Sequence, residues 1–312
     1  MKRLQNKISE SRTALPFTSI YATLIWIAAG LLSQQWWPQF ACFLLSTYLM
    51  VELNNNNMLI RIYSRMVSCA FLMLSTAASF MFDSLDGQLT TLCSLCSLTF
   101  LFKSYQDKAS APAIFTCFFC VGVASMLAIH VLIYVPVMWL SMFFFIQSLS
   151  FRTLGASILG ILAPYWFIMP FMVINNRFGP FLQHISEITK MGDLFDFSSV
   201  TLSQWLILAL VVIVAAIGTL HYLASSYKDK FRTRQLYGCF ITIDIFTLLY
   251  FILQPQHVET CLQVLIVNSS PLIAHFIALT RSRFTNVVFI ILLVLTFALT
   301  VFNLLPNHLI TL

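Results

Sequence analysis

One uncharged stretch restricts the fold of this chain more than any other feature of its sequence. Residues 111–150 contain no Asp, Glu, Lys or Arg, and a run of this length makes about two bilayer crossings at about 20 residues each. Charged residues make up 9% of the 312-residue chain, whereas soluble domains carry about 25%. The alternating ten-residue segments of a membrane β-barrel do not occur. The sequence therefore predicts an all-α, polytopic transmembrane helix bundle.

Apolar runs of membrane-spanning length recur along the chain and predict about 11 spans in one integral membrane domain, residues 1–312. The predicted spans are 16–34, 37–54, 63–82, 86–103, 111–129, 131–149, 154–175, 201–224, 235–253, 260–280 and 284–304. Residues 1–15 are expected to form a cytoplasmic segment. The apolar run after them is long and has no small-residue cleavage site, which favours a retained helix over a signal peptide.

The distribution of basic residues predicts the orientation, because cytoplasmic loops hold the excess of Lys and Arg. With the N-terminus inside, all 17 Lys and Arg except Arg177 and Lys190 fall on the cytoplasmic side. An odd number of spans then places the C-terminus outside. The external loop 176–200 carries Phe181, Ile185 and Ile188 at helical spacing, which predicts a short interfacial helix.

Asp244 is the most informative single residue. It lies in GCFITIDIFTLLYF, near the middle of the predicted span 235–253. An ionised carboxylate there costs several kcal/mol unless it is paired, hydrated or neutral, so we expect Asp244 to face the bundle interior. In a functional role, Asp244 would relay protons or cations or contact a polar substrate. In a structural role, it would form a hydrogen bond to a neighbouring helix. The sequence leaves these interpretations open.

The predicted span 260–280 contains VNSSPLIAH, which includes Asn268, Pro271 and His275. Proline lacks a backbone donor and frees a carbonyl one turn earlier. The segment is therefore either a broken helix whose backbone faces a cavity or a kinked helix whose freed groups bond to the neighbouring serines. His275 follows the proline by one turn and is of a type that titrates near neutral pH.

The segment VELNNNNMLIRIYSR, residues 51–65, is predicted to form the cytoplasmic turn between the second and third spans. Asparagines suit a turn because they tolerate left-handed backbone. Arg61 and Arg65 are placed to meet inner-leaflet phosphates. Glu52 precedes the turn inside an apolar run, and we expect it to pair with Arg61 or Arg65. Arg152, in the inner loop after the sixth span, is interpreted as a topology anchor and kept as a binding candidate.

No metal site and no cofactor are predicted. Two CxxC pairs, Cys93–Cys96 and Cys117–Cys120, lie in apolar segments without a charge to stabilise a thiolate. Helix packing therefore explains them better than zinc or redox chemistry. The chain has no HExxH, no phosphate-binding glycine loop and no serine-nucleophile elbow. The net charge of +6 follows from topology and requires no nucleic-acid partner.

Three stretches together carry a family resemblance. They are the asparagine-rich turn and arginines at 54–65, the block IHVLIYVPVMWLSMFFFIQSLSFRTLGASILGILAPYWF at 129–167, and NSSPLIAHFIAL followed by Arg281 and Arg283. On these the chain resembles a domain-of-unknown-function family of polytopic inner-membrane proteins from Bacteroidetes-group bacteria. The resemblance implies integration in a bacterial cytoplasmic membrane and no particular activity.

Three classes of function remain. The favoured one is a transporter or flippase for a polar or lipid-linked small molecule, with Asp244, Asn268 and His275 around a central cavity. The second is a membrane glycosyltransferase or glycan polymerase using a lipid-linked sugar, with the external Asp83 or Asp86 as base. The third is a non-enzymatic scaffold, in which polar residues only specify packing. Beyond the lipid bilayer and such a substrate, the sequence indicates no nucleic-acid partner and leaves protein partners open.

Overall fold

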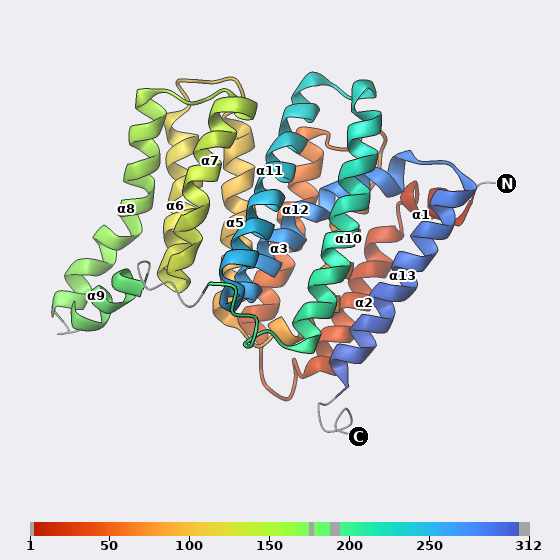
Figure 1. Cartoon of the computed structure of the whole chain (residues 1–312), viewed down its shortest axis with the longest axis horizontal. Coiled ribbons are helices and arrows are strands. Elements are labelled where there is room, and N and C mark those ends of the chain that lie inside the picture. The colour runs from red at the N-terminus through yellow and green to blue at the C-terminus, as the bar shows by residue number, and fades with distance from the viewer. Residues whose placement is uncertain (1–2, 175–177, 188–193, 306–312) are drawn as a thin grey trace.

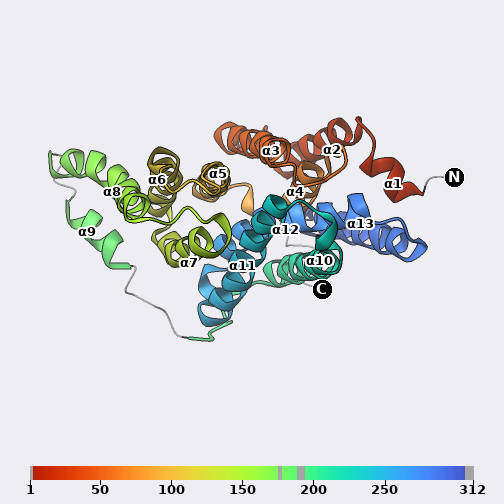
Figure 2. The same cartoon turned by 90° about the horizontal axis from the view of Figure 1, so that it is seen from above.

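The chain folds into a bundle of helices. The structure is a computed structural model of the 312-residue chain and describes residues 3–174, 178–187 and 194–305. Every regular element within these residues is a helix, so the all-α prediction is confirmed. The long helices run between two ends of an elongated slab, in alternating directions (Figure 1 and Figure 2).

A helix overlaps each of the 11 predicted spans. These helices are α2 (Ala14–Ala29), α3 (Trp37–Asn57), α4 (Met66–Ala77), α5 (Leu85–Lys103), α6 (Ala111–Leu127), α7 (Val135–Ser141), α8 (Phe151–Ile174), α10 (Leu202–Ser225), α11 (Phe231–Leu253), α12 (Val258–Leu279) and α13 (Arg283–Leu304). A 3₁₀ turn, Ile129–Tyr134, and a π-helical turn, Met142–Ile146, extend α7 at its two ends.

Seven helical segments among the described residues are long and apolar enough to cross a membrane. They are Leu85–Lys103, Ile129–Ile146, Phe151–Ile174, Leu202–Lys228, Phe231–Leu253, Pro255–Leu279 and Arg283–Leu304. The apolar helices α2, α4 and α6 are shorter. The chain is thus built as a membrane-integral protein, while the count of about 11 crossings and the orientation of the termini stay predictions.

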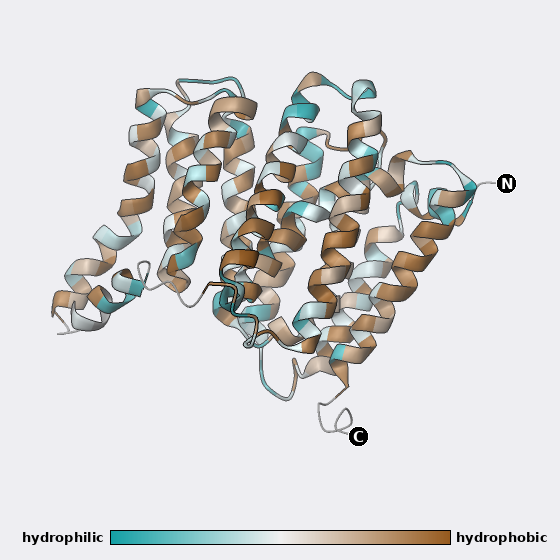
Figure 3. Cartoon of the chain, viewed as in Figure 1, coloured by the Kyte–Doolittle hydropathy of each residue, from teal (hydrophilic) through white to brown (hydrophobic). Residues whose placement is uncertain are grey.

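Hydrophilic residues gather at the two ends of the bundle, and hydrophobic residues cover the helices between them (Figure 3). The Lys and Arg of the described residues lie at one end, here named the basic end, which holds α1 (Leu4–Ser9) and the connections 58–65, 104–110, 147–150, 226–230 and 280–282. The acids Asp83, Asp86, Glu187, Asp196 and Glu259 lie toward the opposite end. Arg177, Lys190 and Ile188 lie outside the described residues.

The N-terminal segment and the loop between α8 and α10 each contain a short helix. The N-terminal segment forms α1, which docks on the basic end: the side-chain amide of Gln5 donates to the carbonyl oxygen of Ile277 at 2.8 Å and to Oγ1 of Thr280 at 2.6 Å. In the loop predicted at 176–200, α9 covers Phe178–Ser186. Its position on a membrane surface stays a prediction.

Helix α12 lies at the centre of the bundle, with α4, α5, α10 and α11 around it (Figure 2). Every residue from Cys261 to Ala278 is buried. The close approach of α10 depends on Gly218, where a Cβ would lie 2.6 Å from the backbone carbon of Leu272. The polar side chains of α12 are therefore enclosed by protein, and their partners must come from neighbouring helices.

Candidate functional site

A buried group of charged side chains lies where α12 reaches the basic end. Nε2 of His275 is 3.0 Å from Oδ2 of Asp229, and Nη1 of Arg61 is 3.5 Å from Oδ1 of the same carboxylate. The His275 and Asp229 side chains are 0% and 2% exposed, while that of Arg61 is 34% exposed. We name these three residues the Arg61–Asp229–His275 cluster. Its carboxylate links a buried imidazole to a guanidinium that reaches the surface.

Asp229 is positioned by the tight connection between α10 and α11. After α10 the chain makes a single 3₁₀ turn, Ser226–Lys228, and becomes extended at Asp229, with φ −97° and ψ 156°. The backbone N–H of Asp229 donates to the carbonyl oxygen of Ser226 at 3.0 Å. This conformation buries the carboxylate while Lys228 and Lys230 stay exposed. The sequence analysis did not predict a role for Asp229. The position of this acid between two lysines, in the basic stretch SYKDKFRTR, could have indicated a carboxylate that pairs with a cation.

Aromatic rings enclose His275 on the sides that Asp229 leaves free. The rings of Tyr222 and Tyr237 stack at 4.5 Å, and their centroids lie 5.5 and 5.2 Å from that of His275. The His221 ring lies 5.4 Å away. The Tyr237 hydroxyl is within hydrogen-bond distance of the carbonyl oxygens of Leu59 (3.3 Å) and Pro271 (3.2 Å). The imidazole is therefore packed among rings, and within the described part of the chain its ion-pair contact is with Asp229.

Asp244 lies near the middle of α11 and faces α12. Its side chain is buried, and Ser269 of α12 donates a hydrogen bond to Oδ2 at 3.4 Å. Oδ1 has no hydrogen-bond partner among the described residues. The carboxyl group thus occupies the bundle interior, as the cost of exposing it to lipid requires.

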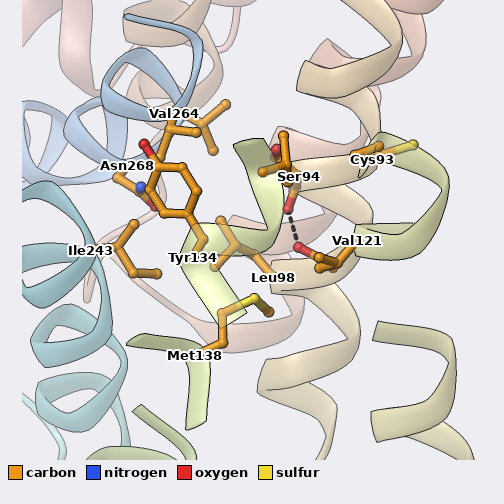
Figure 4. Close-up of a pocket in the computed structure, with 13 residues that line it drawn as sticks. Cys93, Ser94, Leu98, Val121, Tyr134, Met138, Ile243, Val264 and Asn268 are labelled. Carbon is orange, nitrogen blue, oxygen red and sulfur yellow. Dashed lines mark hydrogen bonds between the residues drawn. The ribbon is translucent and has the colours of Figure 1, made fainter. Parts of the chain in front are cut away.

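Asn268 lines a small cavity between α5, α6, α7, α11 and α12 (Figure 4). The cavity measures about 40 Å³ and takes its polar wall from Ser94, Ser97, Tyr134 and Asn268. Oδ1 of Asn268 and the hydroxyl of Tyr134 are buried and have no hydrogen-bond partner among the described residues. A cavity of this size has room for a few water-sized molecules.

The prediction that Asp244, Asn268 and His275 surround one central cavity is wrong. Asn268 and His275 are seven residues apart on α12, which separates them by roughly 10 Å along the helix axis. Asp244 meets Ser269, Asn268 lines the small cavity, and His275 meets Asp229. In place of one cavity, the structure therefore has a row of polar side chains along α12 that make separate contacts. We name this row the file.

The broken-helix interpretation of VNSSPLIAH is also wrong, because α12 continues from Val258 to Leu279 through Pro271. The hydroxyl of Ser270 donates to the carbonyl oxygen of Ile266 at 2.5 Å. The carbonyl that Pro271 frees is that of Val267, whereas the Ser269 hydroxyl donates to Asp244. That the serines satisfy the freed carbonyl therefore stays a prediction.

The segment 51–65 differs from its prediction in two ways. The four asparagines form the last turn of α3, and the left-handed residue that ends it is Met58, with φ 48°. Glu52 accepts a hydrogen bond from the side chain of Asn56, one turn along the same helix, at 2.8 Å. Arg61 instead binds Asp229, and Nε of Arg65 donates to the Tyr63 hydroxyl at 3.2 Å. The predicted pairing of Glu52 with an arginine is therefore wrong, because Glu52 and both arginines contact other residues.

The remaining candidates lie at the surface. Asp83 and Asp86 are exposed, with Asp86 in the first turn of α5, where the hydroxyl of Ser84 caps the helix by accepting from the N–H of Gly87 at 3.0 Å. Arg152 is exposed in the first turn of α8. Ser84 thus supplies the cap, and the two acids are exposed charges beside it. Among the described residues, no three His, Cys, Asp or Glu side chains are grouped to hold a metal ion.

Comparison with known proteins assigns no family to this arrangement. No protein-family model, no curated protein and no solved structure matches the chain. The resemblance noted from the sequence stays an expectation, and the function has to be inferred from the geometry.

Proposed function

We propose that this chain is a carrier, a transporter or flippase, that moves a small polar or lipid-linked molecule across the cytoplasmic membrane of a bacterium. The observation that supports this proposal is the file of buried polar side chains along α12. From the acidic to the basic end these are Gln263, Asn268 and His275, with Asp244 and Asp229 supplied by other segments. Such a file provides polar contacts at several depths of an otherwise apolar bundle.

The energetic cost of these groups favours a carrier over a scaffold. Oδ1 of Asp244, Oδ1 of Asn268 and Nδ1 of His275 have no hydrogen-bond partner among the described residues, and each such buried atom costs about 1–3 kcal/mol. A helix needed only for packing would be more stable with apolar side chains at these positions. A carrier uses the same groups in a second conformation, in which they bind water or substrate.

The Arg61–Asp229–His275 cluster closes the basic end of the file in the conformation described. In the carrier it is the gate that opens toward the cytoplasm. The imidazole of His275 and the carboxylate of Asp229, 3.0 Å apart, form the buried contact of this gate.

Cysteine labelling from the two sides of the membrane tests the proposal. We would place Asn268→Cys in the full chain after replacing its eight native cysteines by serine or alanine. Thiol reagents react with the thiolate, which forms in water and not in a packed apolar interior. A membrane-impermeant methanethiosulfonate should therefore label position 268 when the file opens.

Two control variants define the background of this experiment. Ala274→Cys lies on the same helix and is fully buried, and Ile291→Cys lies on α13 with 57% of its surface exposed. Both should react slowly, the first because it is packed and the second because it faces lipid. If Asn268→Cys is as unreactive as Ala274→Cys from both sides, the carrier proposal is lost and a scaffold remains.

A further inference from the structure

A pocket opens at the basic end beside the Arg61–Asp229–His275 cluster. It measures about 420 Å³ and is walled by the last turn of α3, the connection 58–65 and the connection between α10 and α11, at the top in Figure 1. Arg61, Lys228 and Lys230 line it. Asp229 is the one carboxylate among the described lining residues, so cations outnumber acids three to one.

The charge of the two lysines is not neutralised by the contacts seen in the structure. Nζ of Lys228 lies 5.2 Å from the centroid of the Tyr227 ring, and Nζ of Lys230 lies 3.9 Å from the sulfur of Met58. Asp229 is already held by His275 and Arg61. Both lysines are exposed, so their ammonium groups can turn toward a ligand at little cost.

The N-terminus of α11 adds to the positive potential of this pocket. The helix begins at Phe231, its N-cap residue Lys230 makes no side-chain capping bond, and its first turn holds no acid. Thr233, in that first turn, lines the pocket. Backbone N–H groups at a helix start carry partial positive charge and bind anions.

From these contacts we infer that the pocket binds a phosphate group, carried by a phosphorylated solute or by a lipid headgroup. Three cationic side chains and a free helix start suit a dianionic, tetrahedral ligand better than a single carboxylate. The hydroxyl of Tyr63, which also lines the pocket and accepts from Arg65, keeps its own hydrogen to donate to the rest of the ligand. As the recognition site for cargo, this inference rests on the carrier function; as a binding site it does not.

Binding would also act on the cluster. The contact from Arg61 to Asp229 is 3.5 Å and the guanidinium is 34% exposed. Arginine binds phosphate through two parallel hydrogen bonds, so a phosphate competes with Asp229 for it. The ligand would then leave Asp229 with His275 alone and loosen the basic end of the file.

Equilibrium binding measured by calorimetry tests the site. The full-length protein is titrated in detergent with inorganic pyrophosphate as a free ligand, and in nanodiscs of phosphatidylglycerol or phosphatidylcholine to present headgroups. Arg61→Gln, Lys228→Gln and Lys230→Gln are combined in one variant. Losing these charge-assisted bonds should weaken pyrophosphate binding by about tenfold or more.

A control variant with the same change of charge separates a site from a basic surface. Lys7→Gln, Lys108→Gln and Arg283→Gln are exposed residues of the basic end that do not line the pocket. This variant should bind as the parent does. Equal weakening in both variants, or no saturable binding by the parent, overturns the inference.

The remaining outcomes separate the ligand sources and the two proposals. Saturation by pyrophosphate that does not depend on the lipid indicates a phosphorylated solute, whereas competition by phosphatidylglycerol indicates a headgroup. Pyrophosphate binding together with an unreactive Asn268→Cys supports the site and refutes the carrier. Labelling at position 268 without pyrophosphate binding supports the carrier and refutes the phosphate site.

Discussion

Replacing Asp229 by Asn removes the central charge of the Arg61–Asp229–His275 cluster with almost no change in side-chain volume. The contact with His275 is 3.0 Å between two groups that are at most 2% exposed, and a hydrogen bond to a charged group contributes about 1.5–3 kcal/mol. The Arg61 contact is longer and partly solvated, so it contributes about 0–1 kcal/mol. Since asparagine keeps one acceptor oxygen, we expect Asp229→Asn to lower the free energy of unfolding by about 2 kcal/mol.

Unfolding by SDS in mixed micelles, followed by tryptophan fluorescence, measures this loss. Asp83→Asn makes the same substitution at an exposed carboxylate and should stay within about 0.5 kcal/mol of the parent. His275→Gln should cost more than Arg61→Gln, because burial strengthens the first contact and solvent screens the second. If Asp229→Asn and Asp83→Asn unfold alike, or if the order of His275→Gln and Arg61→Gln is reversed, the reasoning about the cluster is refuted.

Three further substitutions concern positions within the helices. Asp244→Asn should change stability by about 1 kcal/mol or less, because the lost carboxylate has one hydrogen bond, from Ser269, and is buried. The same variant should fail to complement a strain lacking this protein, and full complementation would contradict a relay role. Gly218→Ala should lower the free energy of unfolding by about 1–3 kcal/mol, since its Cβ would lie 2.6 Å from the backbone carbon of Leu272. Gly155→Ala, with nothing within 4 Å of its Cβ, should be neutral or stabilising by up to about 1 kcal/mol in the same unfolding assay.

Helix positions could be read from the sequence because apolar length alone specifies them in a membrane. Each predicted span overlaps a helix, yet lengths differ where local packing decides. The span predicted at 63–82 contains the shorter α4, Met66–Ala77, and a 3₁₀ turn, Ser79–Met81. At its end Phe82 stacks on Trp26 with ring centroids 3.9 Å apart. No periodicity in the sequence indicates a contact between residues so far apart in the chain.

The site was less predictable, because partners depend on the rotation of each helix about its axis. The costs of burying Asp244 and His275 could be read from their position in apolar runs, and both are buried. The hydrogen-bond partners of these two side chains could not be predicted from the sequence. Asp244 and His275 were grouped together because both are polar and intramembrane, whereas the fold gives Asp244 a serine and His275 the carboxylate of Asp229. Glu52 shows the converse, since its partner Asn56 follows from helical spacing of four alone.

The unequal contacts of the cluster determine which part of the basic end moves if the file opens there. Separating His275 from Asp229 would leave two buried groups unpaired, at a cost of about 3–5 kcal/mol. Releasing Arg61 from the same carboxylate costs about 0–1 kcal/mol, and freeing the Tyr237 hydroxyl from the carbonyl of Leu59 about 0.5–1.5 kcal/mol. Conformations a few kcal/mol above the ground state are populated at about 0.1–10%, so release of the Arg61 side chain is more accessible than separation of His275 from Asp229. The rest of the connection 58–65 stays packed, because Leu59 and Ile60 are buried and the Ser64 hydroxyl donates to the carbonyl oxygen of Ser9 at 2.8 Å. We therefore predict that, if the file opens at this end, the Arg61 side chain is released first, and that a phosphate taking Arg61 would act on this weaker contact.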